Sequence, residues 1–204
     1  MKGALFDLDG VLIDSEGQYT RFWSEIDRRY PTGIENFAIK IKGTTLDKIF
    51  EHFPDPSLQR KIVRMLDEFQ HNMPFEMYPD AEEFLTLLQS RGISMAIVTS
   101  SDERKMNVLF DRLPQLRPYF SAIVHAGMIT HSKPHPEPYL KGAEALGLSP
   151  EDCCVFEDSL QGLAAGRASG AKVIAMATTY TADRLQGLAD VIVRSFKEID
   201  ISRL

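Results

Sequence analysis

Two pairs of acidic residues have the type and spacing to do chemistry. Asp7 and Asp9 lie two residues apart, and Glu157 and Asp158 are adjacent. Carboxylates can act as nucleophiles, move protons, or bind a hard metal ion. Gly10 follows the first pair, where it lets the backbone turn sharply and lets a ligand approach its amide. The sequence therefore indicates an acidic site built from two distant segments.

Each acidic pair also has a purely structural interpretation. Asp7 and Asp9 can form a turn that ends a strand, and Asp158 can cap the helix that follows it. If the two segments are neighbours, four carboxylates crowd one cleft, and Coulomb repulsion raises some of their pKa values unless a cation is present. Hard oxygen ligands with open positions suit Mg²⁺, which leaves room for a phosphate.

A lysine and a run of hydroxyls are candidates for anion binding. Lys133 stands just before a predicted helix, where it can neutralise a phosphate, although a lone lysine is usually solvated. Thr99, Ser100 and Ser101 follow a predicted strand, where hydroxyls and free amides form a natural anion site. Alternatively, Ser101 caps the helix expected over 102–112. The candidate phosphate-binding residues are Gly10, Thr99, Ser100 and Lys133.

Short apolar runs predict the strands that must position these residues. They cover residues 2–6, 94–98, 121–125, 153–156, 172–176 and 190–193. Helical patterns lie between them, over residues 80–90, 102–112, 136–146 and 159–168. Strands that alternate with helices predict an α/β fold with a parallel sheet and helices on both faces. The candidate site then lies at the carboxyl ends of the strands, where such sheets bind ligands.

Residues 15–78 break this alternation. They contain no convincing buried strand, and helices are predicted over 18–29, 45–52 and 57–72, separated by prolines and glycines. We expect an α/β core made of residues 1–14 and 79–204, with an all-helical cap at 15–78 inserted after the first strand.

Composition narrows the class of protein. The chain has 204 residues, with 23 Lys and Arg against 29 Asp and Glu, so its net charge is −6. That balance argues against nucleic acid or an anionic membrane surface as the main partner. The adjacent Cys153 and Cys154 fit a reducing compartment, and no apolar run approaches the ~18 residues of a membrane span. We therefore expect a cytoplasmic protein; the composition leaves the oligomeric state open, and a monomer is the default expectation.

Four segments, in this order, resemble the four motifs of the haloacid dehalogenase superfamily: FDLDGVLIDSE, VTSS, SKPHPEPY and VFEDSLQGLAAGRASGA. The nearest likeness is to the β-phosphoglucomutase-like branch, which includes many small sugar-phosphate phosphatases. The resemblance implies a Rossmann-like sheet with strand order 3-2-1-4-5, and it identifies residues 15–78 with the helical cap of the family. It covers nearly the whole chain and is weak over the insertion.

The resemblance also implies roles for individual residues. Asp7 matches the nucleophile that forms an aspartyl-phosphate, and Asp9 matches the general acid that later becomes the base for water. Thr99 matches the hydroxyl that binds the transferring phosphoryl group. Lys133 matches the lysine that steadies the nucleophile and the phosphate.

A magnesium site is implied in the same way. Asp158, with Glu157 beside it, matches the acidic pair of the family's Mg²⁺ site. Asp7 matches a further ligand, and the Asp9 position contributes its backbone carbonyl. The expected cofactor is Mg²⁺, bound by Asp7, Asp9, Glu157 and Asp158.

Some positions depart from the sugar phosphomutases of this branch. Tyr19 stands where those enzymes carry a histidine that helps move the proton, and Leu46 where they carry an arginine that grips a second phosphate. Asp102 and Glu103 replace a Lys-Asn pair, and two carboxylates would repel a distal phosphate. Haloacid chemistry is also disfavoured, because the dehalogenases lack the second aspartate that Asp9 supplies.

The sequence therefore predicts a Mg²⁺-dependent phosphatase that acts on a small phosphorylated metabolite, expected to be a sugar phosphate. Two alternatives stay open. One is a β-phosphoglucomutase-like phosphomutase, and the other is a non-catalytic regulator that binds a phosphorylated ligand on the same fold. The presence of Asp7, Asp9, Lys133 and Asp158 favours an enzyme, because binding alone needs no nucleophile.

Overall fold

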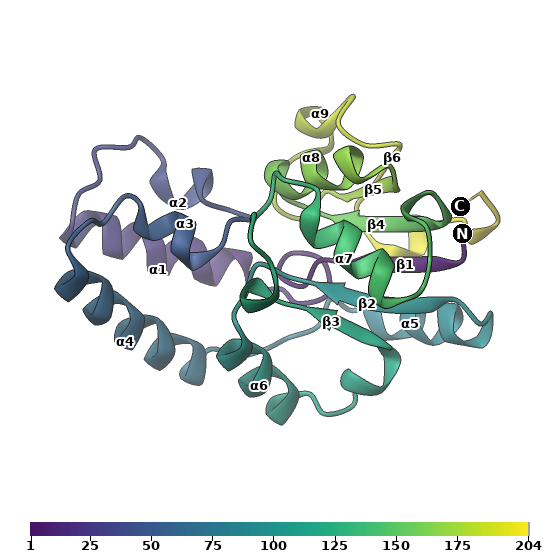
Figure 1. Ribbon diagram of the computed structural model, residues 1–204, viewed down its shortest axis with the longest axis horizontal. Helices are drawn as coiled ribbons and strands as arrows, with labels where there is room; N and C mark the ends of the chain where they lie inside the picture. The colour runs from purple at the N-terminus through teal and green to yellow at the C-terminus, as the bar shows by residue number, and fades with distance from the viewer. Residues whose placement is uncertain (204) are drawn as a thin grey trace.

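The structure, a computed structural model, describes residues 1–203 and has a sheet of parallel strands at its centre (Figure 1). The strands are β1 (Gly3–Phe6), β2 (Ser94–Val98), β3 (Ala122–Val124), β4 (Cys153–Glu157), β5 (Lys172–Met176) and β6 (Val191–Val193). They lie in the order β3-β2-β1-β4-β5-β6, and all neighbouring pairs are parallel. The predicted order 3-2-1-4-5 is confirmed, and β6 adds one strand beyond β5.

Helices occupy two separate regions of the chain. Those that follow β1 are α1 (Glu16–Arg29), α2 (Phe37–Lys40), α3 (Leu46–Phe50) and α4 (Pro56–Asn72). Those that alternate with the later strands are α5 (Ala81–Ser90), α6 (Glu103–Arg112), α7 (Glu137–Ala145), α8 (Leu160–Ser169) and α9 (Ala182–Leu185). Short 3₁₀ turns are η1 (Arg117–Tyr119), η2 (Ala126–Met128), η3 (Pro150–Asp152), η4 (Phe196–Glu198) and η5 (Ile201–Arg203).

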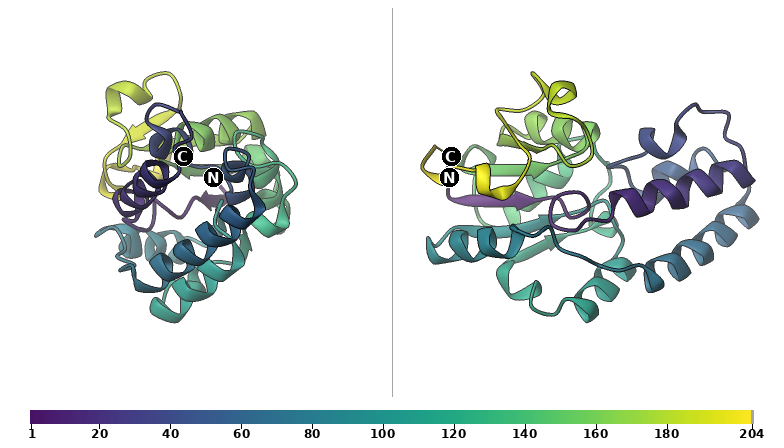
Figure 2. Two further views of the ribbon diagram at one scale, coloured as in Figure 1. Left: turned by 90° about the vertical axis from the view of Figure 1, so that its left-hand side faces the viewer. Right: turned by 180° about the vertical axis from the view of Figure 1, so that it is seen from behind.

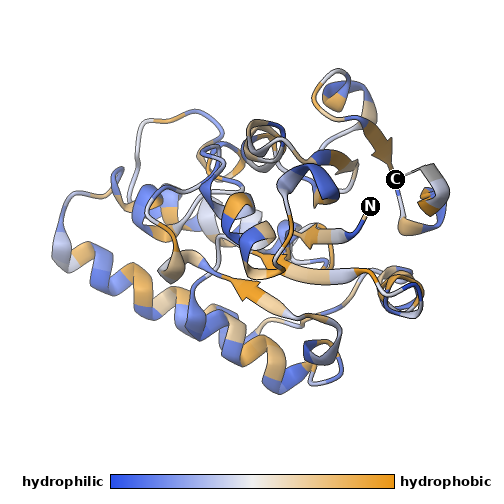
Figure 3. Cartoon of the chain, turned by 45° about the vertical axis from the view of Figure 1, so that its right-hand side comes forward, coloured by the Kyte–Doolittle hydropathy of each residue, from blue (hydrophilic) through white to orange (hydrophobic). Residues whose placement is uncertain are grey.

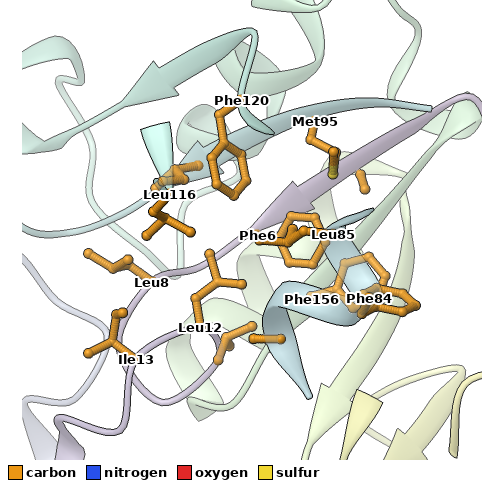
Figure 4. Close-up of a cluster of buried hydrophobic side chains, with 14 of the residues drawn as sticks. Phe6, Leu8, Leu12, Ile13, Phe84, Leu85, Met95, Leu116, Phe120 and Phe156 are labelled. Atoms are coloured by element: carbon orange, nitrogen blue, oxygen red, sulfur yellow. The ribbon is translucent and has the colours of Figure 1, made fainter. Parts of the chain in front are cut away.

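Helices cover both faces of the sheet, because successive side chains of a strand point to opposite sides. Phe6 belongs to the apolar cluster on the side of α5 and α6, whereas Leu5 belongs to the cluster on the side of α7 and α8. The rings of Phe6 and Phe156, on the neighbouring strands β1 and β4, stack with centroids 4.5 Å apart. Figure 4 shows this cluster, and Figure 3 shows the strands coloured as hydrophobic. The central strands are therefore fixed by packing on both faces.

The helices after β1 project from one end of the sheet, away from the N-terminus (Figures 1 and 2). They have an apolar cluster of their own, which includes Trp23, Ile26, Phe37, Ile62 and Leu66. The predicted helices over 18–29, 45–52 and 57–72 are confirmed as α1, α3 and α4. The sequence did not predict α2, because its four residues are too few to show a helical repeat.

Two linkers run side by side where the chain enters and leaves this helical insertion. The amide of Asp14 donates to the carbonyl of Glu76 at 2.8 Å, and the amide of Tyr78 donates to the carbonyl of Leu12 at 3.0 Å. Residues 13 and 77 form an antiparallel bridge between them. The division into a core of 1–14 and 79–204 and a cap of 15–78 stays a prediction, with which these paired linkers agree.

Gly142 allows α7 to lie close to the sheet. A Cβ atom there would stand 2.7 Å from Cγ2 of Val98 on β2 and 3.3 Å from Leu5 on β1. We expect Gly142→Ala to lower the free energy of unfolding by about 1–3 kcal/mol, the usual cost of overpacking. Gly17→Ala is the matched control, since a Cβ there meets nothing within 4 Å, and it should be neutral or stabilise by up to ~1 kcal/mol. Chemical denaturation measures the free energy of unfolding of both variants. An equal change in the two would contradict the close approach of α7 to the sheet.

Candidate active site

The two acidic pairs meet at the carboxyl ends of the central strands. β1 and β4 pair in register, with Phe6 opposite Phe156. Asp7 is the residue after β1, and Glu157 is the last residue of β4. Ligand atoms of Asp7, Glu157 and Asp158 all lie within 4.8 Å of one another. The condition set by the sequence, that the two strands be neighbours, is therefore met.

Lys133 joins these carboxylates from the loop before α7. Its Nζ atom lies 2.7 Å from Oδ1 of Asp7 and 2.6 Å from Oε1 of Glu157, and it donates to the carbonyl of Val98 at 3.2 Å. The side chain is buried. Burial alone would lower the pKa of Lys133, but the carboxylates of Asp7 and Glu157 outweigh it and raise this pKa above its usual value. Lys133 is therefore charged and is not a solvated surface lysine.

Both carboxylate oxygens of Glu157 have hydrogen-bond donors. Oε1 accepts from Lys133 and from the hydroxyl of Tyr139 at 2.9 Å. Oε2 accepts from the backbone amides of Asp158 and Ser159, each at 2.9 Å. This set of contacts holds Glu157 rigidly and directs it toward Lys133.

Asp158 lies against the turn at Gly10. Its carboxylate is buried and accepts from the hydroxyl of Thr179. Gly10 has a φ of +79°, and a Cβ atom there would overlap the Asp158 carboxylate, so only glycine fits. Asp158 does not cap α8. Ser159 does so, because its hydroxyl accepts from the amide of Gly162 at 3.0 Å, which leaves the Asp158 carboxylate for the site.

The three carboxylates of this cluster carry more negative charge than Lys133 alone can neutralise. Ligand atoms of Asp7, Glu157 and Asp158 lie within 4.8 Å of one another, and Lys133 forms ion pairs with the first two of these residues. Burial, together with the charges of Glu157 and Asp9, raises the pKa of Asp7 from 3.8 to about 8, although Lys133 opposes this. Burial and nearby carboxylates also raise the pKa of Asp158 well above its usual value. Oxygen donors with this excess of negative charge fit a divalent cation such as Mg²⁺.

Asp9 occupies a different environment from Asp7. Its carboxylate accepts from the hydroxyls of Ser15 and Ser101, the latter at 3.1 Å, and forms an ion pair with Lys105. Burial acts to raise the pKa of Asp9, but Lys105 and the two hydroxyls outweigh it, and the pKa is lowered. Two aspartates that are two residues apart are thus held in opposite electrostatic conditions.

The hydroxyl run lies at the end of β2. Thr99 is buried, and its Oγ1 accepts from the amide of Ser101 at 3.1 Å. Ser100 donates to the carbonyl of Gly43, in the loop between α2 and α3, at 2.8 Å. The expectation that Ser101 caps the next helix is wrong: Asp102 caps α6 by accepting from the amide of Lys105. The Ser101 hydroxyl is therefore available to bond Asp9.

A cavity of about 120 Å³ lies in front of these residues. One side is formed by strand-end residues, among them Asp7, Asp9, Thr99, Ser100 and Asp158. The other side is formed by the helical insertion, with an apolar wall and a few polar groups. The insertion residues that line it include Glu16, Tyr19, Trp23, Ala38, Ile41, Lys42, Leu46, Leu66 and Gln70.

Sequence reasoning missed several residues that contact the predicted ones, among them Lys105, Tyr139 and Thr179. Lys105 lies in the first turn of α6, an unfavourable place for a cation, but the sequence does not show which carboxylate its side chain reaches. Tyr139 belongs to the SKPHPEPY segment but was not singled out. Thr179 follows β5 in a loop with no distinguishing pattern.

Comparison with known proteins agrees with this geometry. Residues 1–170 match the family of haloacid dehalogenase-like hydrolases. The chain belongs to this family. Hexitol phosphatase A of Escherichia coli (strain K12) is 32% identical over 207 residues, which cover 99% of this chain and 94% of that protein. Glycerol-1-phosphate phosphohydrolase 1 of Saccharomyces cerevisiae is 30% identical, covering 98% of this chain and 85% of that one.

A solved structure shares the whole fold of this haloacid dehalogenase-like hydrolase. It is the HAD hydrolase, family IA, variant 3 from Entamoeba histolytica, with a TM-score of 0.83 and 25% identity over 99% of this chain and 96% of that one. The prediction of a phosphoric monoester hydrolase is confirmed by phosphatase relatives over the full length. Within the described residues, no helix has both the length and the apolarity to cross a bilayer.

The raised pKa of Asp7 makes the stability of the metal-free protein depend on pH. A group whose pKa is higher when folded stabilises the fold fully below its unfolded pKa and loses that contribution as the pH rises through the folded pKa. For Asp7 the window runs from 3.8 to about 8. We therefore expect chelator-treated protein to melt at a lower temperature near pH ~8.5 than near pH ~5.5, and added Mg²⁺ to raise Tm more at the higher pH.

Thermal denaturation at several pH values measures this effect. Asp7→Asn is the control, because it removes the titrating carboxyl and should reduce the slope. A metal-free Tm that rises across the same window in both proteins would contradict the assignment.

Proposed function

We propose that this protein is a Mg²⁺-dependent phosphatase that hydrolyses a small phosphorylated polyol or sugar through an aspartyl-phosphate intermediate. The observation that carries the proposal is the Asp7 carboxylate, which is paired with Lys133 and lines the cavity together with Asp9. The hexitol and glycerol-1-phosphate phosphatase relatives support the substrate class.

In the first step, an oxygen of Asp7 attacks the phosphorus and the bond from phosphorus to the alcohol oxygen breaks. Asp9 passes a proton to the departing alcohol. Because the pKa of Asp9 is lowered in the substrate-free structure, that proton arrives with the substrate, as phosphate esters titrate near pH ~6. In the second step, Asp9 takes a proton from water, which attacks phosphorus and releases phosphate and free Asp7.

The surrounding residues reduce charge repulsion and fix geometry. Lys133 pairs with the nucleophile and offsets its negative charge, while Thr99 lines the cavity and offers a hydroxyl at the end of β2. Mg²⁺, held by Asp7, Asp158 and the backbone carbonyl of Asp9, would supply Lewis-acid stabilisation of the phosphoryl oxygens. Both Glu157 oxygens have donors, so its role is best described as holding Lys133.

A phosphomutase is less well supported by the cavity. A mutase needs a binding site for a second phosphate, and such sites are typically formed by arginine or lysine donors. Leu46 and Asp102 line the cavity at the positions in question. Lys42 forms an ion pair with Glu16, so this cation is already paired.

The direct test is a panel of hexitol, glycerol and aldose phosphates with Mg²⁺, with released phosphate as the readout. We expect hydrolysis of one or more polyol or sugar phosphates, and loss of activity in excess chelator. A wild-type protein that releases phosphate from none of them would refute the proposal.

Asp7→Asn tests the nucleophile. The amide keeps the shape but cannot attack, so we expect turnover to fall by more than ~10³-fold with the fold retained. Asp111→Asn, an exposed carboxylate on α6, is the matched control and should keep wild-type turnover. Near-native turnover of Asp7→Asn, with circular dichroism unchanged, would exclude the covalent mechanism.

A second measurement separates phosphatase from mutase. Because the cavity offers a leucine and a carboxylate where a distal phosphate would bind, we expect phosphate release from hexose monophosphates. We expect no conversion of β-glucose 1-phosphate into glucose 6-phosphate, even with a bisphosphate activator. Coupled detection of glucose 6-phosphate decides the matter, and isomerisation faster than hydrolysis would overturn the phosphatase assignment.

A further inference from the structure

Lys105 is a buried lysine that the mechanism above does not use. It lies in the first turn of α6, and its side chain is 2% exposed. The positive end of the helix dipole and the loss of hydration both oppose a cation there. Its burial is explained by the ion pair between Nζ and Oδ2 of Asp9.

The aromatic ring of Tyr19 fixes Lys105 from the opposite side. The Nζ atom lies 4.5 Å from the ring centroid, within the range of a cation–π contact. The hydroxyl of Tyr19 accepts from Nε2 of Gln70 at 3.1 Å. Tyr19 belongs to α1 and Gln70 to α4, so the helical insertion helps to hold the lysine on the aspartate.

Asp9 needs such support, because it lies in a turn and its carboxylate can rotate about two side-chain bonds. Ser15 bonds one oxygen, whereas Ser101 and Lys105 bond the other. Lys105 is the charged donor, and charge-assisted hydrogen bonds are roughly twice as strong as neutral ones. Without it, Asp9 would keep an uncompensated charge close to Asp7.

We infer that Lys105 is a positioning residue, which holds the carboxylate of Asp9 in the orientation that delivers a proton to the leaving alcohol. This inference rests on the proposed phosphatase function. It predicts a selective defect. Alkyl phosphates need a proton on the leaving oxygen, whereas p-nitrophenolate departs without one.

The test compares kcat/KM for glycerol 1-phosphate and p-nitrophenyl phosphate in the wild type, Lys105→Met and Lys105→Arg, with Mg²⁺ present. General acid catalysis contributes ~10²–10⁴-fold. We expect Lys105→Met to lose at least ~10-fold more activity on the alkyl ester than on the aryl ester, as Asp9→Asn should. Lys105→Arg, which keeps the charge, should recover much of the loss.

Arg104→Met is the matched control. Arg104 is the preceding residue of α6, and its side chain is 55% exposed and pairs with Asp67 and Asp102. We expect its kcat/KM ratio for the two esters to equal that of the wild type.

Thermal denaturation of the same variants gives a readout that needs no turnover. If Lys105 and Asp9 are coupled, Lys105→Met should lower Tm less in an Asp9→Asn background than in the wild type. With an active wild type, two results would overturn this inference. One is that Lys105→Met and Lys105→Arg lower kcat/KM equally on both esters, and the other is that neither variant lowers kcat/KM. A wild type inactive on every phosphate ester would refute the proposed function itself, and the inference with it.

Discussion

The buried ion pairs of Lys133 with Asp7 and Glu157 are the interaction on which the rest of the site depends. A charge this deeply buried is tolerated only when it is paired and hydrogen-bonded. The pairing therefore fixes the loop before α7 relative to β1 and β4, and the hydroxyl of Tyr139 ties α7 to the same carboxylate. The geometry of the proposed active site and the packing of α7 thus depend on the same few bonds.

The same rule organises the cavity as a whole. Lys133, Lys105 and Lys42 come from three different segments, and each pairs with a carboxylate beside the cavity. Since these cations already have partners, a second anionic group on a substrate would have to compete for them. The apolar wall contributed by the helical insertion, which includes Trp23 and Leu66, likewise suits an uncharged leaving group.

The topology of the sheet explains which parts of this site could be predicted from the sequence. Asp7, Thr99 and Asp158 each follow a buried strand, and the carboxyl ends of parallel strands meet at one edge, so their convergence could be predicted without coordinates. Lys105 could not, because its role depends on which way one helical side chain points. The helix caps were misassigned for a related reason: serine and aspartate compete for the same position, and tertiary contacts decided in favour of Asp102.

The paired linkers at the base of the helical insertion also bear on how the chain folds. β1 pairs with β2 across a long stretch of sequence, from Gly3 opposite Ser94, and closing a long loop costs entropy and slows folding. The hydrogen bonds between the linkers, such as that from Tyr78 to Leu12, bring the two ends of the insertion together. Once these bonds form, the two ends of the insertion are already close together. The chain that must close to pair β1 with β2 is then effectively short, so the length of the insertion adds little to the entropy cost of that pairing.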